Sequence, residues 1–416
     1  MQKNLRNRLM VGALAFASAI ALAGCGPTPA TTPSATDSLT SSNDPITILI
    51  GSSGDAETNA VKAAAAAWTA QSGITANVVA ADNLDQQLAQ GFASGQPADV
   101  FYLGAGALPG YADAGDLLAY GSMLPNVSDF YPSLINDYTY KGQLYAAPKD
   151  FSTLGLIIND DLWTAAGLTA ADYPTTWDQL HADAQKLTSG KVTGLVVSGQ
   201  YERLGAFMVA NGSNLMNADQ TKATASDQSN IDALTFAKSM LADGSMKFAA
   251  DVSTGWGGEA FGKALGAMTI EGNWITGAMS TDYKNVNFTV VPMPAAPATG
   301  KSGTMEFSNG WGIAADSPNQ KAALSCVEFM TTATQQMAFA QAFGIMPSLQ
   351  SASSQWTAAF PTLKAFSDGA ATAQGVPTIK GASQVITDLN NSIGALATSD
   401  PATILNTAQT ELQALL

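Results

Sequence analysis

The stretch that decides the fold is residues 46–103, which read ITILIGSSGDAETNAVKAAAAAWTAQSGITANVVAADNLDQQLAQGFASGQPADVFYL. Strand and helix patterns alternate along it, with expected strands at 46–50, 74–80 and 99–103 and expected helices at 57–71 and 84–93. Alternation at this spacing predicts right-handed crossovers and a mostly parallel sheet, hence an α/β fold. Ligands of such sheets lie beyond the carboxyl ends of the strands. Those ends are Gly51–Asp55 and Gly104–Gly106.

A second run of the same kind begins after Tyr145. Its expected strands are 154–158, 194–197, 267–270, 287–291 and 308–315, and its expected helices are 177–187, 201–211, 229–242 and 273–279. Ser317 and Pro318 predict the start of a further helix, with serine as the N-cap and proline in the first turn. The last helix is expected to open at Asp400-Pro401. Because 416 residues exceed what one hydrophobic core usually supports, we expect two lobes.

The composition excludes several kinds of partner and chemistry. The chain is 46% hydrophobic, and its formal net charge of -15 offers no basic surface for a phosphate backbone, so we expect no nucleic-acid binding. His181 is the only histidine, so a site with several histidine ligands for a metal is excluded. Arg203 is the only arginine beyond residue 24, which disfavours bidentate clamps on anionic ligands. We therefore expect no metal and no cofactor.

The N-terminus has the pattern of a bacterial export signal. Lys3, Arg6 and Arg8 precede the apolar run Leu9–Ala21, which is too short to span a bilayer comfortably. The following tetrapeptide, LAGC at 22–25, resembles a lipobox. That resemblance implies a signal peptide over 1–24 and lipidation of Cys25, with the protein held at the extracellular face of the bacterial cell membrane.

Two further features follow from this reading of the N-terminus. Residues 25–44 are rich in Pro, Ser and Thr, which predicts a flexible stalk behind the lipid anchor. Lipidation of Cys25 would leave Cys326 without a disulfide partner. Cys326 shares a helical apolar stripe with Ala323, Val327 and Met330, so we expect it to be a small buried residue.

The usual catalytic and nucleotide-binding motifs are missing. The sequence contains no GxGxxG, GxxxxGK[ST] or GxSxG motif. His181 lies beside the apolar stripe of its predicted helix and is expected at the surface or its boundary. We assign no catalytic residue and do not expect an enzyme. A glycoside hydrolase stays open because paired carboxylates are available, although their spacing selects no pair; they are Asp55, Asp150, Asp160, Asp161, Glu259 and Glu271.

Three tryptophans stand out by their neighbours. Trp256, Trp274 and Trp311 lie next to glycines or at the ends of elements, where a flat ligand could lie on the indole face. Such faces suit apolar CH surfaces or cations. For each of these tryptophans, wedge-like packing in the core is an interpretation of equal weight to ligand binding. Trp163 and Trp177 lie instead within amphipathic helical patterns, where core packing is the default.

The adjacent pair Lys149-Asp150 precedes a strand that reads as buried. An adjacent pair of opposite charges in a loop is usually solvated and has little energetic effect. At a junction between lobes, however, the carboxylate accepts hydrogen bonds and the ammonium donates them. That combination suits a neutral polyol, whose hydroxyl groups both donate and accept.

The most specific stretch for identifying a family is residues 140–168, YKGQLYAAPKDFSTLGLIINDDLWTAAGL. Supporting segments occur in the same order at 97–100, 111–115, 176–180, 267–274 and 310–313. From about Ile46 to the C-terminus the chain resembles the carbohydrate-binding components of ABC importers, the extracellular solute-binding proteins similar to maltose-binding protein. One departure is GVPTIK at 375–380, which lacks the nearby tryptophan of some oligosaccharide binders.

The resemblance implies a two-lobed periplasmic-binding-protein fold of type II. Each lobe would be a doubly wound sheet flanked by helices, with hinge crossovers near Thr153 and Asn309. The first lobe would hold residues 45–153 and 309–344, and the second lobe 154–308 and 345–416. The resemblance and the motifs together predict these ligand-binding residues: Asp55, Gly104, Lys149, Asp150, Trp256, Glu271, Trp274, Asn309 and Trp311.

The function implied is capture of a neutral mono- or oligosaccharide by hinge closure and delivery to the membrane permease of an ABC importer. We expect the protein to act as a monomer. The scarcity of arginine agrees with an uncharged ligand. Two alternatives stay open. One is a protein that binds a polyamine or another cation in an acidic, tryptophan-lined cleft, and the other is a secreted glycoside hydrolase.

Overall fold

The computed structural model describes residues 38–52 and 54–416. The predicted signal peptide, Cys25 and most of the predicted stalk lie outside the described residues. Residues Leu39–Leu416 form one unit. None of the helices in the described part of the chain is long and apolar enough to cross a membrane.

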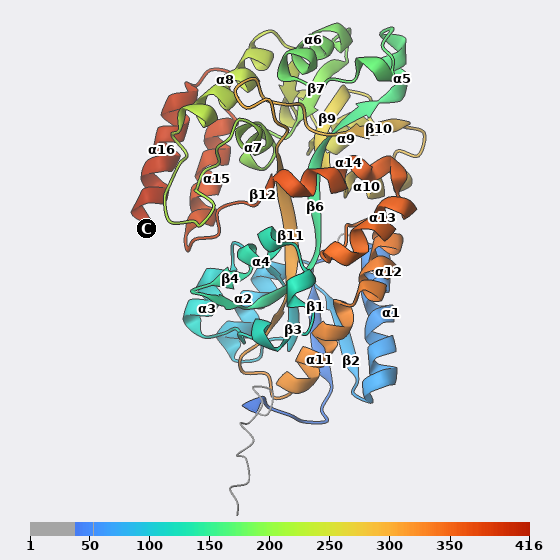
Figure 1. The fold of residues 1–416 in the computed structure, drawn as a ribbon, viewed down its shortest axis with the longest axis vertical. Coiled ribbons are helices and arrows are strands. Elements are labelled where there is room, and N and C mark those ends of the chain that lie inside the picture. Colours follow the sequence, from blue (N-terminus) through green and yellow to red (C-terminus); the bar gives the residue numbers. More distant parts are fainter. Residues whose placement is uncertain (1–37, 53) are drawn as a thin grey trace, which may run out of the picture. The chain divides into compact units, whose positions relative to one another are not determined.

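The opening alternation of strands and helices is present as predicted (Figure 1). Strand β1 (Ile46–Ile50) lies between β2 (Ala76–Ala80) and β3 (Val100–Gly104) and is parallel to both. Helix α1 (Asp55–Ser72) connects β1 to β2, and α2 (Leu84–Ser94) connects β2 to β3. The loops after β1 and β3 therefore meet at one edge of the sheet, where parallel strands present their carboxyl ends.

Two long strands join the halves of the sheet. Strand β6 (Ala146–Asn159) pairs antiparallel with β11 (Thr304–Ile313), and β11 pairs antiparallel with β3. The second half of β6 pairs antiparallel with β9 (Gly266–Gly272). The strand order is β2-β1-β3-β11-β6-β9-β7-β8. The sheet is thus mixed, which corrects the prediction of a mostly parallel one, because its two central strands run against their neighbours.

The remaining strands are short. They are β4 (Thr139–Tyr140), β5 (Gln143–Leu144), β7 (Thr193–Val197), β8 (Met246–Phe248), β10 (Phe288–Val291) and β12 (Ala373–Gln374). Strand β7 is parallel to β8 and β9, as expected for right-handed crossovers through helices. Strand β10 pairs with β6, and β12 pairs with β11.

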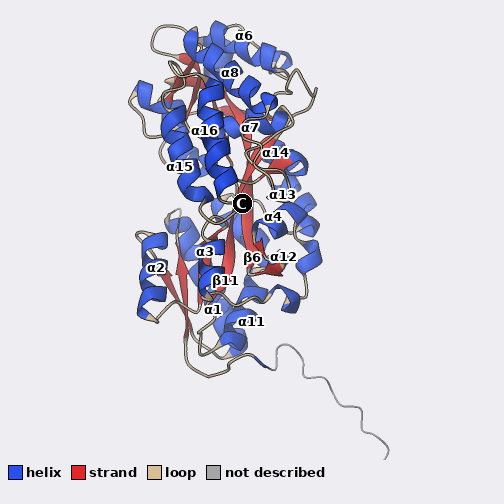
Figure 2. Ribbon diagram, turned by 90° about the vertical axis from the view of Figure 1, so that its left-hand side faces the viewer, coloured by secondary structure: helices blue, strands red, loops and turns tan. Residues whose placement is uncertain are grey.

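Helices flank both halves of the sheet (Figure 1 and Figure 2). Besides α1 and α2 they are α3 (Leu108–Ala114), α4 (Pro132–Asp137), α5 (Asp160–Ala165), α6 (Trp177–Leu187), α7 (Tyr201–Ala210), α8 (Gln228–Ala242), α9 (Gly257–Gly262), α10 (Ile275–Thr281), α11 (Gln320–Met330), α12 (Ala333–Phe343), α13 (Ser353–Ala359), α14 (Lys364–Gly369), α15 (Ala382–Ile393) and α16 (Pro401–Ala414). Helix α16 is capped by Asp400, as predicted.

The start of α11 differs from the prediction. The helix begins at Gln320 with Asn319 as its N-cap, so Ser317 is not the capping residue. The Ser317 hydroxyl instead donates a hydrogen bond of 2.6 Å to the Asp99 carboxylate. This long-range bond fixes the segment before the helix, and it involves a partner that the local sequence pattern does not reveal.

Figure 2 shows α6, α8, α15 and α16 grouped in the upper part of the view and α1, α2 and α11 in the lower part. The two largest hydrophobic cores of the described residues involve different helices. The first lies around β1–β3 with α1, α11 and α12, and includes the predicted buried Cys326. The second lies around β7 and β9 with α6–α8, α15 and α16, and includes Trp163 and Trp177. Met346 and Phe366 pack in the first core, although the predicted division assigned residues 345–416 to the second lobe. The division itself stays a prediction.

Candidate ligand-binding site

Lys149 occupies a β-bulge between the two long strands. In the β6–β11 pairing Asn309 lies opposite Asp150 and Gly310 lies opposite Pro148, so Lys149 is the extra residue. A bulge bends the strand and redirects the inserted side chain, and bulges are frequent next to functional sites. As a result the Lys149 ammonium contacts the carboxylate of the adjacent Asp150. The sequence pair predicted as a loop is therefore a strand irregularity with a fixed geometry.

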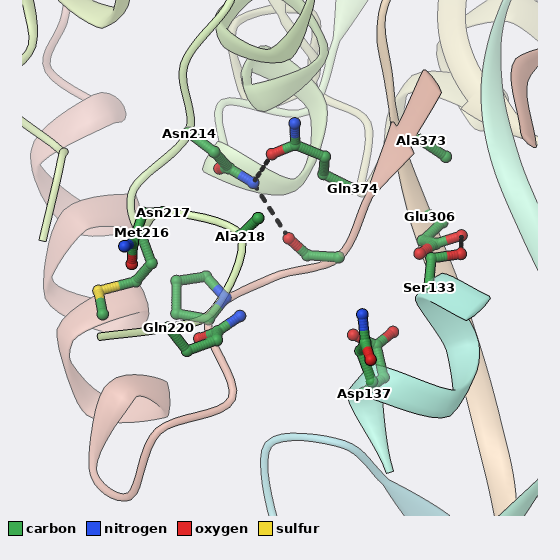
Figure 3. Close-up of a pocket in the computed structure, with 13 residues that line it drawn as sticks. Ser133, Asp137, Asn214, Met216, Asn217, Ala218, Gln220, Glu306, Ala373 and Gln374 are labelled. Carbon is green, nitrogen blue, oxygen red and sulfur yellow. Dashed lines mark hydrogen bonds between the residues drawn. The ribbon is translucent and has the colours of Figure 1, made fainter. Parts of the chain in front are cut away.

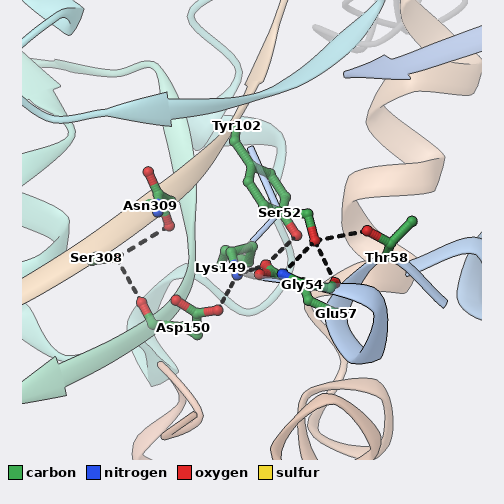
Figure 4. A network of polar contacts seen from close by, with 9 residues as sticks. All are labelled: Ser52, Gly54, Glu57, Thr58, Tyr102, Lys149, Asp150, Ser308 and Asn309. Atoms are coloured by element: carbon green, nitrogen blue, oxygen red, sulfur yellow. Dashed lines mark hydrogen bonds and ion pairs between the residues drawn. The ribbon is translucent and has the colours of Figure 1, made fainter. Parts of the chain in front are cut away.

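The bulge completes a buried polar group that we call the Lys149 cluster: Glu57, Tyr102, Lys149 and Asp150 (Figure 4). Lys149 Nζ lies 2.9 Å from Glu57 Oε1, and the Tyr102 hydroxyl donates a hydrogen bond of 2.9 Å to the same oxygen. The ammonium also lies 4.5 Å from the centre of the Tyr102 ring. Lys149 is only 3% exposed and Asp150 only 7%. Two carboxylates thus share one ammonium away from water.

Burial and pairing act in opposite directions on these charges. Burial raises the pKa of the Asp150 carboxyl, and this outweighs the lowering by Lys149. Burial alone would lower the pKa of Lys149, but the carboxylates of Asp150 and Glu57 hold it above its ordinary value. The lysine therefore stays charged at neutral pH. A buried ion is tolerated only when it is paired and hydrogen-bonded, so each member depends on the others.

Three predicted residues lie in one row across neighbouring strands. Asn309 of β11 pairs with Gly104 of β3 on one side and with Asp150 of β6 on the other. The Asn309 side chain is half-buried. The structure thus brings Gly104, Asp150 and Asn309 together, at the edge where the loop after β3 begins.

The acidic residue of α1 in this cluster is Glu57, which is not among the predicted site residues. The predicted Asp55 is exposed at the first position of the helix and makes none of the recorded contacts with the cluster. Glu57 instead begins the buried face of α1, which continues through Val61, Ala64 and Trp68. A carboxylate on the apolar stripe of a helix is a recognisable signal, because it requires a buried partner.

A second polar group, the Arg203 cluster, consists of Arg203, Glu271, Trp274 and Phe307. Arg203 Nη2 lies 2.8 Å from Glu271 Oε2, and Arg203 Nε lies 3.1 Å from the same oxygen. The Trp274 indole N–H donates a 3.0 Å hydrogen bond to that oxygen as well. The guanidinium carbon lies 5.1 Å from the centre of the Trp274 ring. Arg203 was not among the predicted site residues. Its being the only arginine beyond residue 24 is a signal that could have identified it.

Glu271 is the electrostatic centre of this cluster. The residue is fully buried, and its Oε1 atom has no hydrogen-bond partner within the described part of the chain. Burial raises the pKa of the Glu271 carboxyl, while Arg203 and the Trp274 N–H oppose that rise. One carboxylate is therefore matched by one guanidinium.

The two clusters project from the same face of the β6–β11 pair. Phe307, whose ring meets the Trp274 ring edge-on with 5.6 Å between centres, is two residues from Asn309 on β11. Residues two apart on a strand point to the same face and lie about 7 Å apart. Ser152, opposite Phe307, accepts a 2.9 Å hydrogen bond from the Asn273 N–H, just before Trp274. The Lys149 cluster and the Arg203 cluster thus lie along the same face of β6 and β11.

The three predicted tryptophans have different surroundings. Trp274 and Trp256 are half-buried, and their rings lie against Gly272 and Gly258, where any side chain would collide with the indole. Trp311 is 0% exposed and packs edge-on against Tyr102 within the first core. This burial corrects the prediction of Trp311 as a platform, because neither ring face is open to a ligand. The structure shows the alternative interpretation of Trp311, packing in the core.

The described residues contain no group of three or more His, Cys, Asp and Glu side chains placed to hold a metal ion. His181 has a 25% exposed side chain and contacts Asp243 at the surface, as predicted. The arrangement over β6 and β11 can donate and accept hydrogen bonds and can cover an apolar surface with an indole ring.

Comparison with known proteins identifies the family of this chain. The sequence model of the family "bacterial extracellular solute-binding protein" matches residues 53–337, more than half of the chain. The chain belongs to this family. The resemblance predicted from residues 140–168 and its supporting segments is therefore confirmed at the level of the family.

Solved structures of other proteins share the fold of this solute-binding protein. The GacH receptor of Streptomyces glaucescens, described unliganded and with acarbose, is 20% identical with a TM-score of 0.77, covering 90% of this chain and 98% of that chain. An ABC substrate-binding protein of Listeria monocytogenes in complex with cycloalternan is 22% identical with a TM-score of 0.77, covering 89% and 98%. A cyclic alpha-maltosyl-1,6-maltose binding protein from Arthrobacter globiformis is 20% identical with a TM-score of 0.78, covering 89% and 98%. The predicted two-lobed type II fold is thus confirmed.

Proposed function

We propose that this solute-binding protein captures a neutral carbohydrate, a mono- or oligosaccharide, between its lobes and delivers it to the permease of an ABC importer. The observation that carries the proposal is charge compensation beside an aromatic ring. The Lys149 cluster and the Arg203 cluster each hold a cation of the chain against their buried carboxylates, and the Arg203 cluster includes the half-buried Trp274. The names of the structurally similar proteins, which refer to acarbose and cyclic sugars, agree with it.

Compensation favours a neutral ligand over a cationic one. A polyamine site needs carboxylates that gain a partner only when the amine binds. Here Glu57 and Asp150 already contact Lys149, and Glu271 already contacts Arg203. A sugar hydroxyl, in contrast, both donates and accepts, so it can join such a network without disturbing its charge balance. The indole of Trp274 suits the apolar face of a sugar ring.

The same proposal covers the setting of the protein. Residues 1–24 would be a signal peptide, and Cys25 would carry the lipid that holds the protein at the extracellular face of the cell membrane through the stalk 25–44. The lobes, 45–153 with 309–344 and 154–308 with 345–416, would close on the ligand by bending at β6 and β11. The protein would act as a monomer and without catalysis, releasing its sugar unchanged.

The test is a thermal-shift panel of neutral mono- and oligosaccharides together with putrescine and spermidine. A ligand present at 100 times its Kd should raise stability by about 2.7 kcal/mol. We expect a neutral sugar to raise the Tm of the wild type and of Lys263→Ala, a surface control, but not of Trp274→Ala. The proposal fails if no carbohydrate shifts the Tm while a polyamine does so in a Trp274-dependent way. Chromatography of the bound sugar afterwards would expose hydrolysis, which the proposal does not allow.

A further inference from the structure

A second polar cavity lies on the other face of β11. It has a volume of about 200 Å³ and is walled by α4, residues 214–220, Glu306 of β11 and residues 373–377 (Figure 3). Glu306 is adjacent to Phe307 on β11, so its side chain points away from the face that carries Phe307 and Asn309. This Glu306 cavity is therefore separate from the Lys149 and Arg203 clusters.

Two acidic side chains line the Glu306 cavity without a cation. Glu306 is 3% exposed; its Oε2 atom accepts a 3.1 Å hydrogen bond from the Ser133 hydroxyl, whereas its Oε1 atom has no partner within the described part of the chain. Asp137 of α4 lines the same cavity, and its side chain makes none of the hydrogen bonds or ion pairs recorded for the described residues. A Cβ at Gly375 would lie 2.9 Å from Asp137 Oδ1, so the chain closes tightly over this carboxyl.

The remaining residues of the lining determine which ligand charge the cavity favours. None of the described residues around the cavity is Lys, Arg or His. Carboxamides of Asn136, Asn217 and Gln220 add carbonyl oxygens, and Met216 and Pro377 add apolar surface. Figure 3 shows Asp137 and Glu306 on one side of the space, with Met216 and Gln220 on the other. The lining is thus anionic at one side and partly apolar at the other.

We infer that the Glu306 cavity binds a small organic cation, a short alkyl chain that carries one or two primary ammonium groups. A buried carboxylate that lacks a partner is costly, and an ammonium donates hydrogen bonds and supplies the missing charge. A water molecule takes about 30 Å³ of liquid volume, so the cavity has room for a small organic molecule as well as for water. The inference concerns a site other than the proposed sugar site and does not depend on it.

Without a cation the two carboxyls bind protons more tightly than free carboxyls do, and an arriving ammonium would favour their ionised forms. Burial raises the pKa of Glu306 to about 7, with the Ser133 hydroxyl opposing it. Burial and the nearby Glu306 raise the pKa of Asp137. The other titratable side chain that faces them is the buried Tyr138, whose pKa is also raised by burial. No basic side chain acts on either carboxyl, so an arriving ammonium meets no resident competitor.

The experiment is a thermal titration of the full chain with putrescine from about 0.1 to 10 mM, against NaCl and CaCl2 at equal ionic strength. We expect a saturable rise in Tm with putrescine only. In Glu306→Gln and in Asp137→Asn the apparent Kd should rise at least tenfold, whereas Trp274→Ala should keep the wild-type response. Using two separate variants keeps the test valid if one of them folds poorly, which circular dichroism without ligand would reveal.

Four results would overturn the inference. These are a rise that NaCl reproduces, a rise with CaCl2 but not putrescine, a response unchanged in both carboxyl variants, and a response lost in Trp274→Ala. The last result would place the amine in the proposed sugar site and would count against the proposed function as well. Failure of the Glu306 cavity alone would leave sugar binding untouched, so the two failures are distinguishable.

Discussion

The two faces of the β6–β11 pair carry acidic groups in opposite electrostatic states. On one face Glu57, Asp150 and Glu271 contact Lys149 or Arg203. On the other face Glu306 and Asp137 line a cavity with no cation among its described lining residues. Two strands thus separate a region whose acidic side chains contact cations of the chain from a region whose acidic side chains do not. The number of acidic residues therefore does not decide the ligand of a site; what decides it is whether the chain supplies the opposite charge.

The largest effect on stability should come from removing the Lys149 ammonium. Lys149→Ala leaves the carboxylates of Glu57 and Asp150 buried without their shared cation. We expect a loss of about 3–5 kcal/mol in the free energy of unfolding, measured by chemical denaturation. Lys263→Ala is the matched control, because Lys263 pairs with Glu259 at the surface, and should cost less than about 1 kcal/mol. Equal losses in both variants would show that the cluster is not sustained by its charge pairing.

Trp311→Ala and Trp274→Ala should separate packing from binding. Trp311 is fully buried in the first core, so its truncation should cost about 3–5 kcal/mol of stability. Trp274→Ala should leave the fold largely intact but weaken sugar binding by about 2 kcal/mol, roughly 30-fold. Calorimetric titration and denaturation of both variants check this. The opposite pattern would restore Trp311 as the ligand platform.

A gentler disturbance of the same ring is Gly272→Ala. The added methyl group would collide with the indole of Trp274 and tilt it away from its position beside Arg203. We expect a roughly tenfold weaker affinity for the sugar, about 1.4 kcal/mol. Gly258→Ala, which disturbs Trp256 in the same way, is the matched comparison. If only Gly258→Ala weakened binding, Trp256 would be the ligand-contacting tryptophan instead.

On the uncompensated face, stability should depend on pH through Glu306. Its folded pKa of about 7 lies above the ordinary 4.5, so the folded protein keeps a proton that the unfolded chain loses between these values. This group therefore stabilises the fold least above pH 7, and stability should fall by on the order of 1–3 kcal/mol as pH rises from 4.5 to 7. Glu306→Gln should reduce that slope and leave the part that the other buried carboxyls, such as Asp137, contribute, whereas the surface variant Glu259→Gln should keep the whole slope. Thermal unfolding across this range, without amines, would refute the assignment if both variants behaved like the wild type.

Much of this arrangement was predictable from periodicity. The alternation in residues 46–103 predicts β1, α1, β2, α2 and β3 with their order, because each element shows its apolar pattern locally. Lys149, Asp150, Glu271 and Trp274 were also predicted, from their motifs and from the family resemblance. These residues lie in the two clusters that the structure assembles.

The remaining features depend on pairing between distant segments. The bulge at Lys149 exists only in register with β11, which lies more than a hundred residues later. The partnership of Arg203 with Glu271 joins α7 to β9. The Glu306 cavity is built from four separate segments, and its unpaired carboxyl oxygen has no signature in the sequence. Trp311 was misplaced because its glycine neighbours suggested an open face, while the core of the first lobe fills that space.

The central claim is that compensated carboxylates beside Trp274 make a site for a neutral sugar. Its most direct test is calorimetric titration of the best sugar from the thermal panel at about 20 mM and about 500 mM NaCl. We predict binding with a Kd that changes less than about twofold, because salt screens only interactions between charges. A site whose best ligand is a polycation, bound through Trp274 and weakened steeply by the same salt, would contradict the claim.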